Sequence, residues 1–189
     1  MFEELVHLDK ELFLYLNNLG NTSWDGFWMF ITGKINWIPL YLVLLFLAFK
    51  NFGKKRTLVL LVAVGLMILC TDQLSNFFKY GVQRLRPCYD PELSGLMRLV
   101  KTSCGGKFGY FSGHAINSFA VAFFFSYLMG RKWKLLSIFL MVWAFMVAYS
   151  RIYIGVHFPL DVISGSLVGI VLGWLFAKLY IFAIHKYHV

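Results

Sequence analysis

The chain has 189 residues, of which 59% are hydrophobic and only 14% are charged, a balance far from that of an ordinary water-soluble domain. The formal net charge is +9, but the basic residues fall between apolar segments and form no recognisable nucleic-acid-binding motif. Composition and charge therefore argue against a soluble domain and against nucleic acid as a partner, and favour a membrane-embedded chain that binds anionic lipid or phosphate.

The first 34 residues contain two short apolar segments rather than a membrane span. Residues 2–18 place leucines and aromatic side chains among acidic residues, a pattern typical of an amphipathic helix that lies along the membrane surface. The same acids give this segment the wrong charge for a signal peptide, so we expect it to remain in the mature protein. A second apolar piece, from Trp24 to Ile31, is also too short to span. Residues 1–34 are therefore predicted to form N-terminal interfacial amphipathic helices.

Five longer apolar segments follow in residues 35–189, and most are near the length that crosses about 30 Å of hydrocarbon as a helix. They cover 36–49, 57–78, 113–129, 135–149 and 160–184, and a polar loop at 80–111 separates the second from the third. The predicted fold class is all-α, a polytopic transmembrane helical bundle of about five spans. In the fifth span, Gly165, Gly169 and Gly173 make a smooth stripe that favours close packing inside the bundle over a dimer interface.

A five-span topology brings the ends of the second and fourth spans to the same membrane face as the starts of the third and fifth. Ionisable side chains on that face are costly unless they pair or serve a function, and a bound phosphate would give the basic ones a function. The residues collected there are Lys79, Arg84, Arg86, Ser112, His114, Arg151, His157 and Asp161.

The local sequence around several of these residues suits an anion site. Arg86 precedes Pro87, which disfavours a continued helix and lets the arginine turn back toward the face. Ser112 can cap the third span, so that the amides of Gly113 and His114 point at an anion. A cation and a helix N-terminus can therefore approach one phosphate from different directions.

His157 and Asp161 form a second chemical pair. Pro159 suits the first turn of a helix, and Asp161 follows His157 by four residues, so the two side chains lie close if the turn is helical. A carboxylate on one imidazole nitrogen leaves the other nitrogen able to attack. The sequence therefore predicts a histidine nucleophile that is oriented by an acid.

Three motifs in this arrangement resemble those of the type 2 phosphatidic acid phosphatase family, which is related to vanadium-dependent haloperoxidases. The family pattern is Lys, six residues and Arg-Pro; then Pro-Ser-Gly-His; then Ser-Arg, five residues, His, three residues and Asp. This chain matches it with Lys79 to Arg86-Pro87, with Ser112-Gly113-His114, and with Ser150-Arg151 through His157 to Asp161. The three spacings fit and are together highly specific, although they cover less than half of the chain. Phe111 stands where the family usually has proline, which bears on loop rigidity more than on chemistry.

The resemblance implies a phosphatase mechanism that uses no metal and no cofactor. His157 would attack phosphorus to form a phosphohistidine, Asp161 would hold and polarise it, and His114 would protonate the leaving oxygen. The developing charge would be stabilised by the phosphate-binding residues Lys79, Arg86, Ser112, Gly113 and Arg151.

The predicted function is therefore hydrolysis of a lipid phosphomonoester or diphosphate by an integral membrane enzyme. The substrates that the family suggests are phosphatidic acid, phosphatidylglycerol phosphate, undecaprenyl diphosphate and a lipid A phosphate, and the sequence does not choose among them. A membrane transporter or a non-catalytic lipid-phosphate-binding protein stays an alternative, because either could gather charges in a bundle. The expected partners are the lipid substrate and the bilayer, without nucleic acid, and the oligomeric state stays open.

The orientation rests on short basic clusters. Each membrane face has nine Lys and Arg residues in this topology, so the bias of basic loops toward the cytoplasm does not decide by count. The tight clusters at 50–56 and 131–134 are more informative than bases retained for phosphate chemistry, so we expect an inner or plasma membrane protein with an extracytoplasmic site. Cys88 and Cys104 in the polar loop would then form a disulfide worth about 3 kcal/mol, with two unpaired thiols as the alternative.

Further residues at this face are expected to have structural or interfacial roles. Arg84 is assigned to a headgroup or solvent contact rather than to the phosphate site. Asp72 is expected to pair with a buried polar group such as Tyr or Ser, with tuning of the site as the alternative. Tyr153 is expected to be an interfacial aromatic, with a place at the lipid entrance as the alternative. Headgroup contacts are also expected for three other bases of the loop, Arg98, Lys101 and Lys107.

Overall fold

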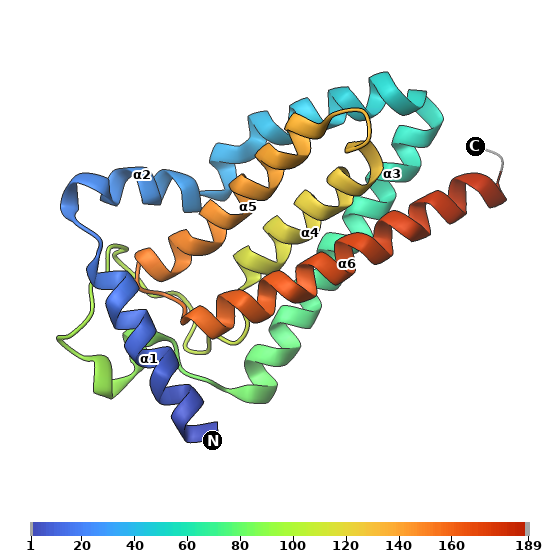
Figure 1. The fold of residues 1–189 in the computed structure, drawn as a ribbon. Helices are drawn as coiled ribbons and strands as arrows, with labels where there is room; N and C mark the ends of the chain where they lie inside the picture. Colours follow the sequence, from blue (N-terminus) through green and yellow to red (C-terminus); the bar gives the residue numbers. More distant parts are fainter. Residues whose placement is uncertain (1, 188–189) are drawn as a thin grey trace.

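The computed structural model describes residues 2–187, which form a bundle of α-helices with irregular connections (Figure 1). No strand occurs in this range, and its one ladder-type pairing is an isolated antiparallel bridge between Leu85 and Phe108. The all-α prediction is therefore confirmed. The helices are α1 (Phe2–Asn18), α2 (Thr22–Thr32), α3 (Ile38–Val82), α4 (Gly113–Met129), α5 (Lys134–Tyr153) and α6 (Pro159–Lys186), with short 3-10 turns at Lys34–Trp37, Pro87–Tyr89 and Pro91–Leu93.

α3 consists of two helical spans joined by a sharp break at Gly53. This glycine has φ 76° and ψ 174°, a conformation that residues with a side chain rarely adopt. The chain reverses there, and the second half of α3 runs back toward the end of the bundle from which the first half came (Figure 1). The two halves, with α4, α5 and α6, are the five apolar segments that the sequence predicted, although the second half of α3, α5 and α6 extend beyond the predicted bounds.

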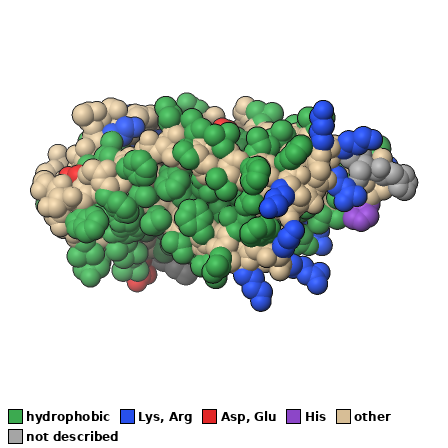
Figure 2. Space-filling model, turned by 90° about the horizontal axis from the view of Figure 1, so that it is seen from above, with side chains coloured by type: hydrophobic (Ala, Val, Ile, Leu, Met, Phe, Trp, Pro, Cys, Tyr) green, Lys and Arg blue, Asp and Glu red, His purple; other side chains and the backbone are tan. Residues whose placement is uncertain are grey.

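The outer surface of the bundle suits a lipid environment. Within the described range, the segments Lys34–Val82, Lys134–Tyr153 and Pro159–Lys186 are long and apolar enough to cross a membrane, and α4 is a shorter apolar helix of 17 residues. Figure 2 shows a broad band of hydrophobic side chains over the middle of the molecule, with Lys and Arg gathered at one end. The chain is therefore an integral membrane protein. Outward-facing apolar side chains include Leu42, Phe46, Leu58, Val62, Phe145, Leu167 and Val171.

α4 is the central helix, and it packs closely against the glycine stripe of α6. A Cβ added at Gly169 would lie 2.4 Å from the carbonyl oxygen of Ile116, and one at Gly173 would lie 2.5 Å from that of Ala120. Only glycine permits such an approach of two helix backbones. The stripe therefore serves packing inside the bundle, as the sequence favoured.

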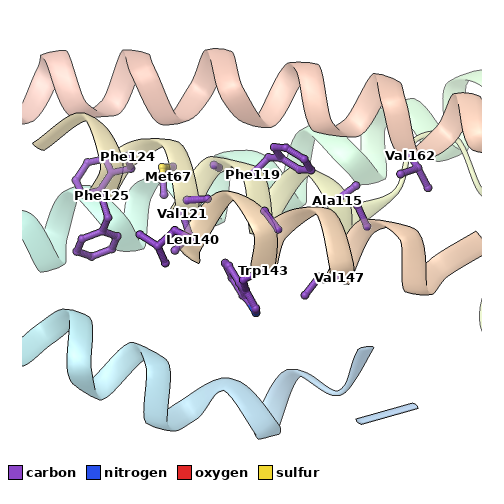
Figure 3. Close-up of a cluster of buried hydrophobic side chains, with 14 of the residues drawn as sticks. Met67, Ala115, Phe119, Val121, Phe124, Phe125, Leu140, Trp143, Val147 and Val162 are labelled. Carbon is purple, nitrogen blue, oxygen red and sulfur yellow. The ribbon is translucent and has the colours of Figure 1, made fainter. Parts of the chain in front are cut away.

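The hydrophobic core surrounds α4 on its other sides. Figure 3 shows Phe119 and Phe125 of α4 in one cluster with Met67 of α3, Trp143 of α5 and Val162 of α6. In a membrane such side chains leave lipid rather than water, so close van der Waals packing between the helices, and not the hydrophobic effect, stabilises this cluster. This core fixes the relative positions of the helices whose ends carry the motif residues.

α1 lies across one end of the bundle, where it packs against α5 and the start of α6 (Figure 1). Its buried face is formed by Asp9, Phe13 and Asn17, which follow one another at intervals of four residues. The helix predicted for residues 2–18 is thus present, but two polar side chains point into the protein, while its placement on the membrane surface stays a prediction. The outward side chains of α1 include Leu5, Leu8, Leu12 and Tyr15.

The long loop between α3 and α4 is closed by a disulfide. Cys88 and Cys104 are bonded, with 6.3 Å between their Cα atoms, whereas Cys70 is a free thiol within α3. The pairing is the one that the sequence predicted. The loop therefore forms a closed ring of chain beside the ends of α3 and α4.

Candidate active site

The centre of the site is the pair His157 and Asp161 at the start of α6. Pro159 occupies the first turn of this helix, and His157 lies in the turn that precedes it. His157 Nδ1 is 3.3 Å from Asp161 Oδ2, and that same oxygen accepts a hydrogen bond of 3.0 Å from the Phe158 amide. Both side chains are buried. Because Asp161 engages Nδ1, Nε2 is the ring nitrogen that remains for chemistry.

The surroundings of His157 favour its neutral form. Burial is the main cause that lowers the pKa of His157 well below its usual value, and the positive charges of Arg151, Arg86 and Lys79 lower it further. The backbone of Gly109 acts in the opposite direction through a hydrogen bond. A neutral imidazole is the form that can act as a nucleophile, so this environment suits such a role for His157.

Arg86 is held beside this pair by the loop backbone. Its Nε donates to the Phe108 carbonyl at 3.2 Å, and its Nη1 donates to the Cys104 carbonyl at 2.9 Å. A Cβ added at Gly109 would lie 3.1 Å from both Arg86 Cγ and Asp161 Oδ2 and 3.6 Å from His157 Nδ1. Gly109 therefore lies between Arg86 of the loop and the pair His157 and Asp161. Nothing in the sequence indicated this role.

The N-terminus of α4 supplies the next side of the site. The Ser112 side chain accepts a hydrogen bond of 3.5 Å from the Ala115 amide and caps the helix, as predicted. The Ser112 amide donates to the Asp161 carbonyl at 2.9 Å, which fixes the start of α4 against α6. Lys79 Nζ lies 3.6 Å from the position that a Cβ on Gly113 would take. A lysine and a helix N-terminus thus face the same space beside the histidine.

Arg151 reaches the site from the last turn of α5. The side chain is buried, and its Nη1 donates to Thr32 Oγ1 of α2 at 2.5 Å. Its Nε has no hydrogen-bond partner among the described residues. A buried guanidinium with an unused donor is costly unless an anion completes it, so this arrangement suits a phosphate.

His114 lies at a cavity of about 590 Å³ between the two halves of α3, α4 and α5. The wall is mostly apolar, and its polar members cluster near the start of α4. Among these, Asn117 Nδ2 donates to Asp72 Oδ1 at 2.9 Å, so Asp72 has a protein partner, an amide rather than the predicted Tyr or Ser. The lining includes His114, Gly113, Thr32, Lys34, Asp72, Asn117, Leu61, Val64, Ile68, Val121 and Trp143.

The prediction for Arg84 is wrong, because its guanidinium points into the protein. Nη1 lies 3.0 Å from Asp161 Oδ1, and Nη2 lies 2.5 Å from Asp9 Oδ2. The spacing of Arg84 and Arg86, two residues apart, could have indicated that both reach the site. Leu85 between them forms a strand-like bridge with Phe108, and in extended chain the residues on either side of such a position point to the same face. Sequence reasoning placed only the second arginine at the site. It had no signal for Asp9, which comes from a distant helix.

Two further predictions of interfacial roles are also wrong. Arg98 Nη2 lies 3.0 Å from Asp25 Oδ2 of α2, so it pairs within the protein rather than with a headgroup. Tyr153 is buried, and its hydroxyl donates to the Asn21 carbonyl at 2.8 Å and contacts Asp25 Oδ1 at 2.9 Å. In both cases the partner lies on α2, whose packing against α5 the sequence did not reveal.

Comparison with known proteins gives consistent matches over most of the chain. The model of the PAP2 superfamily matches residues 56–184. The lipid A 4'-phosphatase of Bacteroides thetaiotaomicron is 41% identical over 179 residues, which cover 93% of this chain and 78% of that protein. The lipid A 4'-phosphatase of Porphyromonas gingivalis is 37% identical over 182 residues, which cover 96% and 76%.

A solved structure gives the same result for the fold. The crystal structure of a transmembrane PAP2 type phosphatidylglycerolphosphate phosphatase from Bacillus subtilis matches with a TM-score of 0.73, at 21% identity, over 93% of this chain and 86% of that chain. The family match spans the three motifs between Lys79 and Asp161. The chain belongs to the PAP2 superfamily and is an integral membrane lipid phosphatase.

Proposed function

We propose that the enzyme transfers a phosphoryl group from a lipid to His157 and then to water. His157 Nε2 attacks phosphorus, the bond from phosphorus to the lipid oxygen breaks, and His114 gives a proton to that oxygen. A water molecule then attacks the phosphohistidine, gives up a proton to His114, and inorganic phosphate leaves. The observation that supports these roles best is the oriented, buried His157 and Asp161 pair among three basic side chains.

Stabilisation of the phosphoryl oxygens falls to the basic residues and the start of α4. Lys79, Arg86 and Arg151 come from three segments, and each adds positive charge near His157. Donors fixed before the reaction stabilise the transition state without reorganisation, which is the largest contribution in phosphoryl transfer. We assign the Gly113 amide to the same set, because Lys79 Nζ lies beside it.

The substrate that we propose is the 4'-phosphate of a lipid A-type glycolipid. A general acid must contact the leaving oxygen, so the lipid part of the substrate lies on the side of His114, where the apolar cavity begins. The paired Asp72 and Asn117 side chains in its wall suit a leaving group with hydroxyl and amide groups, such as an acylated sugar. The two relatives that are 41% and 37% identical are lipid A 4'-phosphatases, which supports the same choice.

The membrane and face that we propose are the inner membrane and its extracytoplasmic side. The disulfide closes the loop that holds Arg86, which fits an oxidising compartment. Most of the basic side chains in Figure 2 gather at the opposite end of the bundle, where α3 reverses and α6 ends, which fits a cytoplasmic end. We also propose that the exposed leucines of α1 rest in the membrane interface beside the site.

The test is phosphate release from a panel of lipid phosphates by the detergent-solubilised enzyme. The panel contains lipid A 1,4'-bisphosphate, undecaprenyl diphosphate, phosphatidylglycerol phosphate and phosphatidic acid, with and without EDTA. We expect preferential loss of the 4'-phosphate, located by mass spectrometry of the product, and no effect of EDTA. Preference for another lipid would contradict the substrate assignment, and inactivation by EDTA would contradict the metal-free mechanism.

The matched variants are His157→Ala and His114→Ala, compared with His185→Ala at the opposite end of the bundle. We expect the first to abolish turnover. The second should slow release of lipid alcohols more than release of a good leaving group such as para-nitrophenol, because a good leaving group needs no proton. Unchanged turnover by His157→Ala would remove the nucleophile assignment, whatever the substrate.

A further inference from the structure

The buried face of α1 follows the catalytic turn between α5 and α6. Asn17 Nδ2 donates to the Ile152 carbonyl at 3.1 Å and to the Tyr153 carbonyl at 2.9 Å, at the end of α5. One turn earlier on α1, the Phe13 ring packs edge-on against that of Phe158, with 5.4 Å between centroids. α1 therefore contacts the turn that contains His157 along its length, and not only at one point.

The third member of this face, Asp9, is linked to the catalytic carboxylate through one arginine. Arg84 bridges the two acids, with Nη1 at 3.0 Å from Asp161 Oδ1 and Nη2 at 2.5 Å from Asp9 Oδ2. The other Asp9 oxygen accepts a hydrogen bond of 2.9 Å from the Leu160 amide in the first turn of α6. The Arg84 guanidinium lies over the Phe158 ring, 4.2 Å from its centroid. Asp9 thus holds both the arginine and the helix start that position Asp161.

The burial of Asp9 indicates that this contact is specific. An acid on an amphipathic helix normally faces water, and removing a carboxylate from water costs several kcal/mol unless it is paired and hydrogen-bonded. Asp9 is 3% exposed, whereas Glu11, two residues later, is exposed on the other face of α1. The Asp161 carboxylate contacts His157, the Phe158 amide and Arg84, and these three partners leave it little freedom to turn.

We propose that Asp9 and Arg84 are positioning residues for the reaction. Without Asp9, Arg84 loses the partner that fixes one side of its guanidinium and can turn from Asp161 toward the phosphate site. Asp161 would then be less well oriented against His157 Nδ1, and attack would slow without loss of substrate binding. The N-terminal helix is accordingly a part of the active-site architecture. This inference rests on the role proposed above for Asp161.

The experiment is a double-mutant cycle with Asp9→Asn and Asp161→Asn, measured as kcat and KM on the lipid substrate. We expect Asp9→Asn to lower kcat roughly 10- to 100-fold with KM changed less than about twofold, because small misplacements of a reacting group cost that much. In the Asp161→Asn background the same substitution should lower kcat less than about threefold, because its target is already lost. Glu11→Gln on the exposed face of α1 should leave both constants unchanged.

Two controls separate positioning from folding. The amount of vanadate bound at saturation counts competent molecules, because this phosphate analogue occupies the site without turnover, and it should be the same in Asp9→Asn as in wild type. Leu140→Ala creates a core cavity 11 residues before Arg151 on α5, about 16 Å along the helix, and should lower the Tm with kcat per vanadate-binding site unchanged. A fall in the number of vanadate-binding sites that accounts for the whole loss in Asp9→Asn would overturn the inference, as would an equal kcat loss in both backgrounds. Full activity of Asp161→Asn would instead overturn the proposed role of Asp161.

Discussion

The two halves of the active site differ in how firmly they are held. On the His157 side, the imidazole, the Asp161 carboxylate and the Arg84 and Arg86 guanidinium groups all have protein partners at hydrogen-bond distance. On the His114 side, the histidine faces a cavity of about 590 Å³ with a mostly apolar wall. This difference indicates that the His157 side is arranged for chemistry and that the His114 side accommodates a lipid. Substitutions on the His157 side should act on kcat, and those on the His114 side on KM, apart from His114 itself, whose proposed proton transfer acts on kcat.

The largest effect outside the two histidines is expected at Arg151. Arg151→Gln removes a buried cation whose Nε donor has no protein partner in the described part of the chain, and it should lower kcat about 100- to 1,000-fold. The measurement is steady-state phosphate release at saturating substrate. Arg131→Gln, at the basic end of the bundle, is the matched control and should have no effect. A loss confined to KM would contradict the proposed role of Arg151 in stabilising the transition state.

The disulfide is expected to support the same half through Arg86. The Cys104 carbonyl accepts a hydrogen bond from Arg86 Nη1. The double variant Cys88→Ser with Cys104→Ser should therefore hold Arg86 less firmly and lower kcat about tenfold. The free energy of unfolding should fall by about 3 kcal/mol on the chain-entropy model. Activity and thermal unfolding of the double variant are compared with those of Cys70→Ser, which removes only the free thiol. Full activity together with an unchanged Tm would show that the loop holds Arg86 without the bond.

Substitutions in the cavity wall should change substrate binding, measured as KM. Val64→Trp places a large ring in the cavity wall and should raise KM for a long-chain lipid phosphate severalfold, with kcat nearly unchanged. Turnover of para-nitrophenyl phosphate, which has no acyl chain, should not change. Val62→Trp, two residues earlier and exposed on the outer surface of α3, is the matched control. If both tryptophans act alike, the cavity does not bind the lipid.

The smallest effect concerns pH. His157 must be neutral to attack, and nearby positive charge lowers its pKa, so activity through this group is lost only as pH falls below that lowered pKa. Arg86→Gln removes one of these charges and should raise the pKa of His157, which moves the acid limb of kcat/KM to higher pH. The same substrate is used for wild type and variant, so that ionisation of its phosphate cancels. A limb that moves to lower pH would contradict the assigned electrostatics.

The sequence predicted the parts of the site that depend on local spacing. His157 and Asp161 lie four residues apart in a helical turn, and Ser112 caps the helix that it precedes, so both geometries follow from chain order. The five apolar segments follow from hydropathy, which also placed the motif residues at one end of the bundle. The break at Gly53, which separates two of these segments within α3, is harder to predict from the sequence, because the positive φ of a glycine depends on the surrounding fold.

The contacts that sequence reasoning missed join distant segments. Asp9 pairs with Arg84, which is 75 residues away in the sequence, and Thr32 accepts a hydrogen bond from Arg151, which is 119 residues away. Hydropathy patterns contain no information about such pairs. α1 illustrates the physical reason: its acids look alike in sequence, but only Asp9 finds a cation and an amide that compensate its burial. The outward leucines of the same helix favoured an interfacial interpretation that left its buried polar face unrecognised.

The most direct test of the account is to trap the covalent intermediate and locate it. Enzyme mixed with lipid substrate labelled in its phosphate and quenched in alkali, in which phosphohistidine survives, should carry one label on the peptide that contains His157. The label should form in the presence of EDTA and be absent from His157→Ala. A label on another residue, or steady phosphate release by His157→Ala without any label, would contradict the assignment of His157 as the nucleophile.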